Sequence, residues 1–255
     1  MIFNRVHGGA TPAFTASFNN AWSGIQTGGG EAALAIFESG TLTVPTASSR
    51  LFDLMLVGGG KNGSNAYFDG LDASYQYHYL KAGNGGNGGN IVTVTGIAIP
   101  AGSHAITIGE ANGETTVTIG GTTYSTASGS HAAGGSGELN DWGTNYPATV
   151  GTGGEYAFGA SGSVPLLSSV SYGGNAYNLN SGKFGAGGGG GFFGNGNVDG
   201  GATNGGQGGK WANGYPGTFF GAGGGGGGLV QGTQTPYAGG TGFRGILLMR
   251  THPTT

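Results

Sequence analysis

The chain contains no cysteine among its 255 residues. Disulfide bonds, thiolate metal sites and thiol nucleophiles are therefore excluded. Charged residues make up only 7% of the chain, and the eight Lys and Arg residues are spread singly. A basic stripe of the kind that binds nucleic acid is therefore missing. The chain also lacks any run of about 18 apolar residues, so we expect no membrane insertion.

Motifs for catalysis are equally scarce. Residues 83–88 fit the GxGxxG pattern, but such a match arises by chance at this glycine content, and no helix pattern follows it. Gly-Lys pairs are never followed by Ser or Thr, and the G-x-S-x-G elbow of serine hydrolases is absent. The five histidines are scattered and the eleven acidic residues are spread out, which argues against a metal site and against a paired-carboxylate glycan depolymerase. We predict no enzyme, no cofactor and no metal.

Glycine is what the sequence has in excess: 64 of the 255 residues, against an ordinary usage of about 7%. The two longest runs, residues 187–191 and 223–228, each follow a Phe-Gly-Ala string that begins at Phe184 and Phe220. Glycine-rich chains usually behave as flexible linkers. However, disordered chains are typically charged and poor in aromatics, and this chain is 11% aromatic with 36% hydrophobic residues.

The glycines also follow a three-residue register. Residues 85–90 read GGN-GGN, and residues 205–210 read GGQ-GGK. A period of three matches a left-handed extended helix of the polyproline II type, which has no internal hydrogen bonds. Its N–H and C=O groups need outside partners, and strands without Cβ atoms can approach closely enough to supply them. The register therefore predicts a bundle of polyglycine-II helices, with a flexible linker as the alternative.

Strand patterns occupy about residues 32–125 and the extreme C-terminus. Residues 51–57 are continuously apolar, which predicts a strand buried on both faces, and residues 104–108 and 115–119 alternate as half-exposed strands do. Gly120 and Gly121 mark a two-residue hairpin turn. No comparable strand pattern follows until the closing strand at 245–250, which we expect to return to the same sheet system. No segment shows a helical period with caps.

These patterns predict an all-β fold: an antiparallel β-sandwich with a glycine-rich polyglycine-II helix bundle inserted before the last strand. We divide the chain into an N-terminal arm or attachment segment (1–31), the β-sandwich strands (32–127) and a glycine-rich region with recognition loops and the closing strand (128–255).

The segments at residues 40–45, 52–60 and 239–250 resemble the opening and closing strands of glycine-rich domains in bacteriophage tail proteins. The glycine blocks resemble those of the polyglycine-II tip adhesins of T-even-type phage long tail fibres. This resemblance implies a virion protein of the tail fibre or baseplate, located on the tail or host-contacting surface. It implies a host surface receptor, protein or glycan, and other virion tail proteins as partners. Tail fibres are often homotrimers, whereas the tip adhesins need not be.

Aromatic residues between the glycine runs are the candidate binding residues. Tyrosine and tryptophan supply rigid contact area with a polar tip, as in recognition loops, and an alternating Tyr-x-Tyr-x-Tyr segment places its tyrosines on one face. Phe184, Phe192, Phe193 and Phe220 lie beside the longest glycine runs, so we expect them to be buried caps of the bundle. The alternative for the whole set is that the aromatics cap the bundle or contact other virion subunits, in a purely structural fibre, decoration or plug protein. The candidate receptor-binding residues are Tyr75, Tyr77, Tyr79, Trp142, Tyr146, Trp211 and Tyr215.

Overall fold

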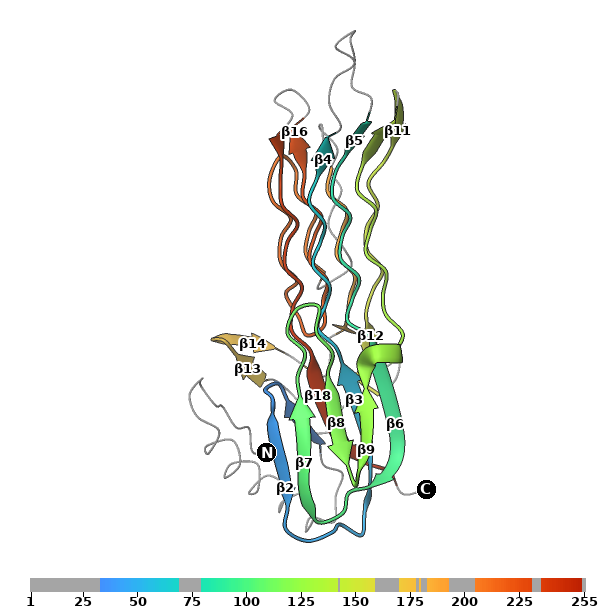
Figure 1. The fold of residues 1–255 in the computed structure, drawn as a ribbon, viewed down its shortest axis with the longest axis vertical. Coiled ribbons are helices and arrows are strands. Elements are labelled where there is room, and N and C mark those ends of the chain that lie inside the picture. Colours follow the sequence, from blue (N-terminus) through green and yellow to red (C-terminus); the bar gives the residue numbers. More distant parts are fainter. Residues whose placement is uncertain are drawn as a thin grey trace.

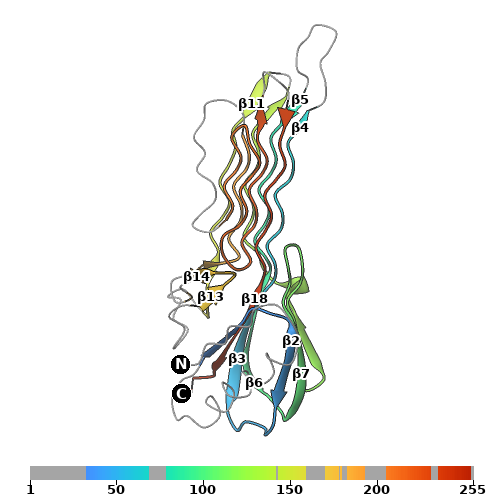
Figure 2. The same ribbon diagram turned by 90° about the vertical axis from the view of Figure 1, so that its left-hand side faces the viewer.

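The computed structural model describes residues 33–68, 79–141, 143–158, 170–177, 179, 183–192, 205–230 and 235–253. The regular secondary structure of this part is almost all β, with antiparallel sheets and one short 3-10 helix, η1 (Thr126–Ser128). The molecule is elongated, with the longest strands at one end and long extended segments that run to short strands at the other end (Figures 1 and 2). The predicted arm at residues 1–31 lies outside the described residues.

We call the two large sheets the base. One four-stranded sheet has the order β1-β18-β3-β6, and the other has the order β2-β7-β8-β9. The closing strand β18 pairs with both β1 and β3, which confirms that the chain returns to its first sheet. The strands of the base are β1 (Ala33–Ile36), β2 (Gly40–Val44), β3 (Leu51–Val57), β6 (Ile91–Ala98), β7 (Gly102–Thr107), β8 (Thr116–Ile119), β9 (Thr122–Ser125) and β18 (Ile246–Thr251).

Both sheets contribute side chains to one hydrophobic core. Leu54 and Leu247 come from the first sheet, and Leu42 and Val117 from the second, all with 0% exposure. All but the first residue of β3 are buried, as its continuous apolar sequence predicts, while β7 and β8 alternate. The hairpin prediction is also confirmed, because the glycine pair between β8 and β9 has positive φ, as the tight turn requires.

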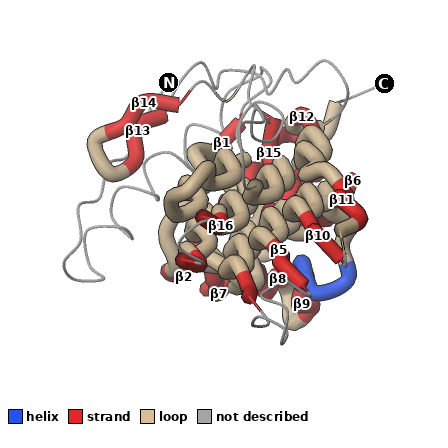
Figure 3. The backbone as a smooth tube through the Cα atoms, turned by 90° about the horizontal axis from the view of Figure 1, so that it is seen from above, coloured by secondary structure: helices blue, strands red, loops and turns tan. Residues whose placement is uncertain are grey.

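Extended glycine-rich segments leave the base side by side, and we call them together the glycine array. The segments are joined by backbone hydrogen bonds that recur every three residues. For example, the N–H groups of Gly58, Lys61 and Ser64 donate to carbonyl oxygens of the segment 82–90, at 2.8–2.9 Å. Figure 3 looks along the array, and the segments are seen there as coils viewed end-on. The period of three in the sequence is thus repeated in the hydrogen bonds.

Residues 221–229 form the central segment of the array. Three successive N–H groups, from Gly223 to Gly225, donate to three different segments, and the next three repeat the same sequence of partners. The carbonyl groups of the same residues accept from three further segments. Hydrogen bonds also join each of these neighbours to the next, so they close a ring. The ring segments are 58–66, 82–90, 185–192, 205–210, 212–217 and 237–245, and the outer segments 130–138 and 149–154 bind to the ring.

This close packing is possible because glycine, which lacks a Cβ atom, stands at the positions where the backbones touch. A Cβ built on Gly226 would lie 1.8 Å from the carbonyl oxygen of Gly83, and one on Gly225 would lie 1.8 Å from that of Gln207. The neighbours are backbone atoms, which cannot rotate away as a side chain can. The array draws on segments from both sides of the predicted boundary between residues 127 and 128, because segments 58–66 and 82–90 belong to its ring.

Hydrophobic clusters close the array at both ends. Toward the base lies the junction cluster, which includes Phe184 and Phe220, both 0% exposed. At the far end, which we call the tip, Leu80 and Leu229 form a smaller cluster with Ala66 and Ala82. Phe192 is also buried, at 5% exposure. The burial predicted for Phe184, Phe192 and Phe220 is confirmed, and Phe193 lies outside the described residues.

Short strands that the sequence did not predict lie at these two ends. They form two groups: Figures 1 and 2 show one group at the tip and the other near the junction. The tip strands are β4 (Tyr67–Phe68), β5 (Tyr79–Lys81), β10 (Leu139–Asp141), β11 (Thr144–Tyr146), β16 (Leu229–Val230) and β17 (Thr235–Pro236). The junction strands are β12 (Glu155–Tyr156), β13 (Val170–Tyr172), β14 (Asn175–Tyr177) and β15 (Lys183–Phe184).

Candidate functional site

A row of four residues crosses the sheet at the tip. The strand order is β11-β10-β5-β4, and Tyr67, Lys81, Leu139 and Tyr146 are directly opposite one another in its register. Residues opposite one another on antiparallel strands share a face of the sheet. Tyr67 and Tyr146, at the two ends of the row, are 54% and 52% exposed. We call these four residues the tip row.

The adjacent row explains which face is outward. Phe68, Leu80 and Asn140 follow in the same register, and Leu80 and Phe68 pack into the tip cluster. Because side chains alternate along a strand, the tip row points away from this cluster. Asn140 also braces the β10–β11 hairpin, since its amide donates to Asn145 Oδ1 at 2.9 Å and its Oδ1 accepts from Gly143 N–H at 3.1 Å. These two hydrogen bonds hold the hairpin that contains Leu139 and Tyr146 of the tip row.

Trp211 is a third exposed aromatic, at 45% exposure, on the turn that joins the ring segments 205–210 and 212–217. Its φ is +50°, a backbone conformation that bulky residues rarely adopt. Such strain gathers at functional sites more often than elsewhere. The ammonium group of Lys210 lies 5.5 Å from the Trp211 ring centroid, so a cation accompanies this aromatic side chain.

Tyr215 is 56% exposed, but it lies along the side of the array. Its carbonyl oxygen accepts from Gly225 N–H at 2.8 Å, one three-residue repeat further from the tip than the bond between Gly228 and Ala212. Tyr215 therefore lies on a ring segment of the array, whereas Tyr146 lies in the tip strand β11.

The remaining candidates can be placed only in part. Tyr75, Tyr77 and Trp142 lie outside the described residues. Tyr79 is in β5, where its backbone pairs with Asp141. Tyr67 was not among the predicted binding residues, although it directly follows the glycine-rich segment 58–66 and precedes the tyrosine-rich stretch. An aromatic residue at the outer end of a glycine segment was the signal that could have identified it.

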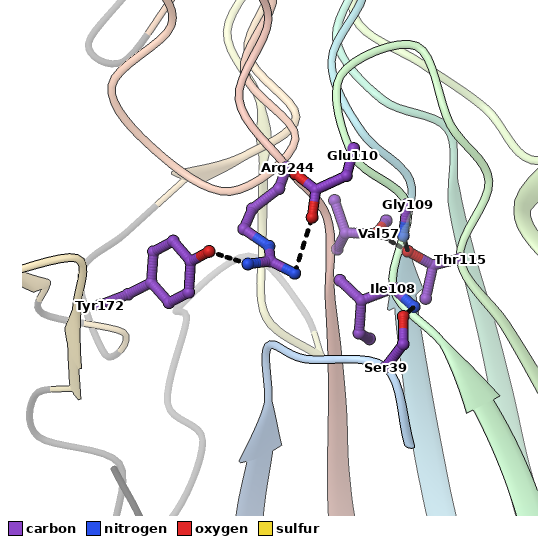
Figure 4. Close-up of polar contacts among 8 residues, drawn as sticks. All are labelled: Ser39, Val57, Ile108, Gly109, Glu110, Thr115, Tyr172 and Arg244. Atoms are coloured by element: carbon purple, nitrogen blue, oxygen red, sulfur yellow. Dashed lines mark hydrogen bonds and ion pairs between the residues drawn. The ribbon is translucent and has the colours of Figure 1, made fainter. Parts of the chain in front are cut away.

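The junction holds a buried cation (Figure 4). Arg244 has a side chain only 10% exposed, lies 3.0 Å from a carboxylate oxygen of Glu110, and donates to the hydroxyl of Tyr172. Its guanidinium also lies 4.5 Å from the Tyr172 ring centroid. Burial lowers the pKa of Arg244, and the charges of Glu110 and Glu38 oppose that shift. These contacts tie a ring segment to the loop at Glu110 and to β13, which is a structural role.

Nearby hydrogen bonds anchor the array to the base (Figure 4). The Thr115 hydroxyl donates to the carbonyl oxygen of Val57 at 2.7 Å and accepts from Gly109 N–H at 3.1 Å. The N–H of Ile108 donates to Ser39 Oγ at 2.9 Å. Val57 is the last residue of β3, so these bonds fix the point at which the chain passes from sheet to glycine segment.

The base contains a buried carboxylate, that of Asp53. Asp53 is 1% exposed and accepts from Arg250 Nε at 3.0 Å, from the N–H of Gly96 at 3.0 Å, and interacts with His252 Nδ1 at 2.6 Å. Burial alone would raise the pKa of Asp53, but the hydrogen bonds from His252, Gly96 and Arg250 outweigh it, so the pKa is lowered. The register between β3 and β6 shifts at this residue, and the carboxylate satisfies the backbone there.

Within the described residues, no group of three or more His, Asp or Glu side chains could hold a metal ion. No helix in that part is long and apolar enough to cross a membrane. No protein-family model matches the chain, and no curated protein matches it either.

Proposed function

We propose that the chain is a β-sandwich that carries a bundle of polyglycine-II helices. The support is the hydrogen-bond pattern of the central segment, in which successive residues bond to three different neighbours and the pattern repeats after three. A helix of the polyproline II family has three residues per turn and no hydrogen bonds within the helix, so its backbone groups bond to neighbouring segments. The sandwich is supported by the single core shared between the two sheets of the base.

On this scaffold we propose a phage virion adhesin of the tail fibre or baseplate, which binds a host surface receptor through aromatic side chains at the tip. The observation that carries the proposal is the tip row, in which two tyrosines about half exposed flank Lys81 and Leu139. Trp211 supplies a further exposed aromatic on a strained turn. The proposed location of the protein on the phage tail is supported by the sequence resemblance to glycine-rich phage tail proteins.

The scaffold suits binding for an energetic reason. Association costs free energy for every side chain and loop that must be ordered on contact. The glycine array has its segments already fixed by backbone hydrogen bonds, and tyrosine and tryptophan have few rotatable bonds to restrict. Little ordering is therefore left for the moment of contact. The side chains of the tip row also favour binding over catalysis, because this row contains no paired acid and base.

A purely structural virion component is the second candidate. Many aromatics of the chain pack against one another at the junction, for example Tyr177 with Phe219 and Phe220 at centroid separations of 5.6 and 5.2 Å. An exposed tyrosine on the tip row could pack in the same way against a neighbouring virion subunit. In that case the tip row would be buried in the assembled particle.

Labelling and adsorption experiments separate the candidates. Gold-labelled antibodies against the chain should decorate the tails of the phage that encodes it. Phage with Tyr146→Thr and Trp211→Asn should then lose most adsorption to the host. Threonine suits an exposed strand position, and asparagine tolerates the positive φ of residue 211, so the fold is preserved. Leu51→Thr is the matched control, because Leu51 is 44% exposed but lies in the base.

Each result has a definite reading. Labelled tails together with adsorption lost only in the tip variant support the adhesin. Labelled tails together with normal adsorption of the tip variant favour the structural component. Unlabelled virions would rule out both candidates.

A further inference from the structure

Several N–H groups at the edges of the glycine array donate to side-chain oxygens. On the ring segment 237–245, the N–H groups of Tyr237, Gly240 and Phe243 point inward and donate to the central segment at 2.7–3.0 Å. The N–H groups of Gly239 and Gly242 cannot reach that segment. They donate instead to Asn65 Oδ1 and Asn62 Oδ1, at 3.0 and 2.9 Å, and Ala238 N–H donates to Asn213 Oδ1 at 3.0 Å.

The outer segment 130–138 repeats this arrangement. Its inward bonds, from Gly135 and Glu138, go to the segment 185–192 at 2.7 and 2.9 Å. Three of its other N–H groups donate to side chains of the two segments that flank it. Gly134 and Gly137 donate to Asn87 Oδ1 and Asn84 Oδ1, both at 2.9 Å, and Ser136 donates to Thr149 Oγ1 at 2.7 Å.

The pattern follows from the geometry of a threefold chain. Each segment has three rows of N–H groups, and in the interior each row meets the backbone of a neighbouring segment. At an edge, one or two of those neighbours are missing. The asparagines stand three residues apart, at 62 and 65 and at 84 and 87, so successive amides stay in register with successive N–H groups of the flanking segment. Asn87, the third residue of a Gly-Gly-Asn repeat, is thus placed to accept a backbone N–H of the flanking segment.

We propose that these asparagines are edge caps, which stop the glycine array from extending into a second copy of the chain. A row of unpaired backbone groups is a template for another chain, as it is at the exposed edge of a β-sheet. A side-chain oxygen that accepts the outward N–H removes the donor that a second array would need. The inference is independent of receptor binding.

Removal of one pair of caps tests the proposal. In Asn62→Ala with Asn65→Ala, the amides of Gly239 and Gly242 should exchange with solvent at least about fivefold faster, because each loses its hydrogen bond. Sedimentation velocity should show association that rises with protein concentration. The companion variant, Asn62→Asp with Asn65→Asp, keeps an acceptor oxygen at both positions. It should retain slow exchange at both glycines and remain monomeric.

Two further variants keep the test decisive. Asn84→Ala with Asn87→Ala removes caps from a different edge and should expose the amides of Gly134 and Gly137, so the proposal remains testable if one pair unfolds the chain. Asn175→Ala is the matched control, because Asn175 is exposed on β14. Unchanged exchange in both alanine pairs would overturn the proposal. Faster exchange in a chain that stays monomeric at every concentration would overturn it too, as would association of the aspartate variant.

Discussion

The base and the glycine array are held together by opposite means. In the base, side chains such as Leu42, Leu54 and Val117 fill the space between two sheets and are fully buried. In the interior of the array, the space between segments is closed by backbone contact, and an added Cβ at Gly226 or Gly225 would overlap a carbonyl oxygen. Removal of atoms should therefore damage the base, and addition of atoms should damage the array.

The comparison also shows how each region obtains specificity. The base has large and small apolar side chains that fit in one arrangement, which is the usual source of a unique core. The array has nearly identical segments, so its order has to come from elsewhere. The hydrophobic clusters at the junction and the tip fix both ends, and the asparagine side chains fix the register along the edges. Side chains at the ends and edges thus replace side chains in the interior.

The largest effect is expected from one added methyl group in the central segment. Gly226→Ala would place its Cβ 1.8 Å from the carbonyl oxygen of Gly83, and backbone cannot yield as a side chain can. We expect a loss of more than about 4 kcal/mol in the free energy of unfolding, measured by guanidinium denaturation. Amide exchange across residues 223–228 should become fast at the same time.

A matched glycine outside the array provides the control. Gly121 lies in the β8–β9 turn with φ +85° and nothing within 4 Å of an added Cβ. Gly121→Asn should cost less than about 1 kcal/mol, since asparagine visits this conformation readily. Equal losses at Gly121 and Gly226 would show that backbone contact is not what holds the array.

The next largest effect is expected from removal of atoms in the base. Leu54→Ala empties part of the shared core, where the side chain is 0% exposed, and should lower the free energy of unfolding by about 3 kcal/mol. The denaturation midpoint measures this loss. Amide exchange at residues 223–228 should stay slow in native conditions, because Leu54 packs in the core of the base. Fast exchange there would mean that the two regions unfold as one unit.

A pH-dependent effect is expected at Asp53. Its pKa is lowered in the folded chain, so the ionised form contributes stability above the pKa of the unfolded state, and this stability is lost as the pH falls through the folded pKa. Asp53→Asn should cost about 2 kcal/mol at pH 7, because it weakens hydrogen bonds to a charged group. Urea denaturation from pH 7 down to pH 2 should show the difference from the parent chain shrinking below about pH 4. A difference that stays constant over this range would contradict the role given to the carboxylate.

The parts of the fold that the sequence predicts are those with a periodic side-chain signal. Three local patterns predicted structure that is observed. They are the alternation in residues 104–108 and 115–119, the Gly120-Gly121 turn and the apolar run at 51–57. The return of the closing strand could also be inferred, because a second continuous apolar run needs a buried position. The burial of Phe184 and Phe220 followed from their size beside bare backbone.

Pairing within the array could not be predicted in the same way. Glycine segments carry no side-chain code, so nothing in residues 223–228 says which six neighbours surround them. The ion pair of Asp53 with Arg250 joins residues far apart in the chain, and single residues of that kind carry no spacing signal. The GGN-GGN register of residues 85–90 predicted the helices but not the task of the asparagines, since Asn84 and Asn87 accept backbone N–H groups of another segment.

The smallest effect on stability is expected at the tip row, where the comparison between surface and core can be made within one sheet. Tyr146 is 52% exposed, and Leu80, in the adjacent row, is 0% exposed. Tyr146→Thr should change the free energy of unfolding by no more than about 0.5 kcal/mol, while Leu80→Ala should cost about 2 kcal/mol or more through loss of the tip cluster. Thermal denaturation of both variants measures the two losses. Because a surface kept for binding contributes little to folding, a large loss at Tyr146 would instead assign the tip row to the packing of the array.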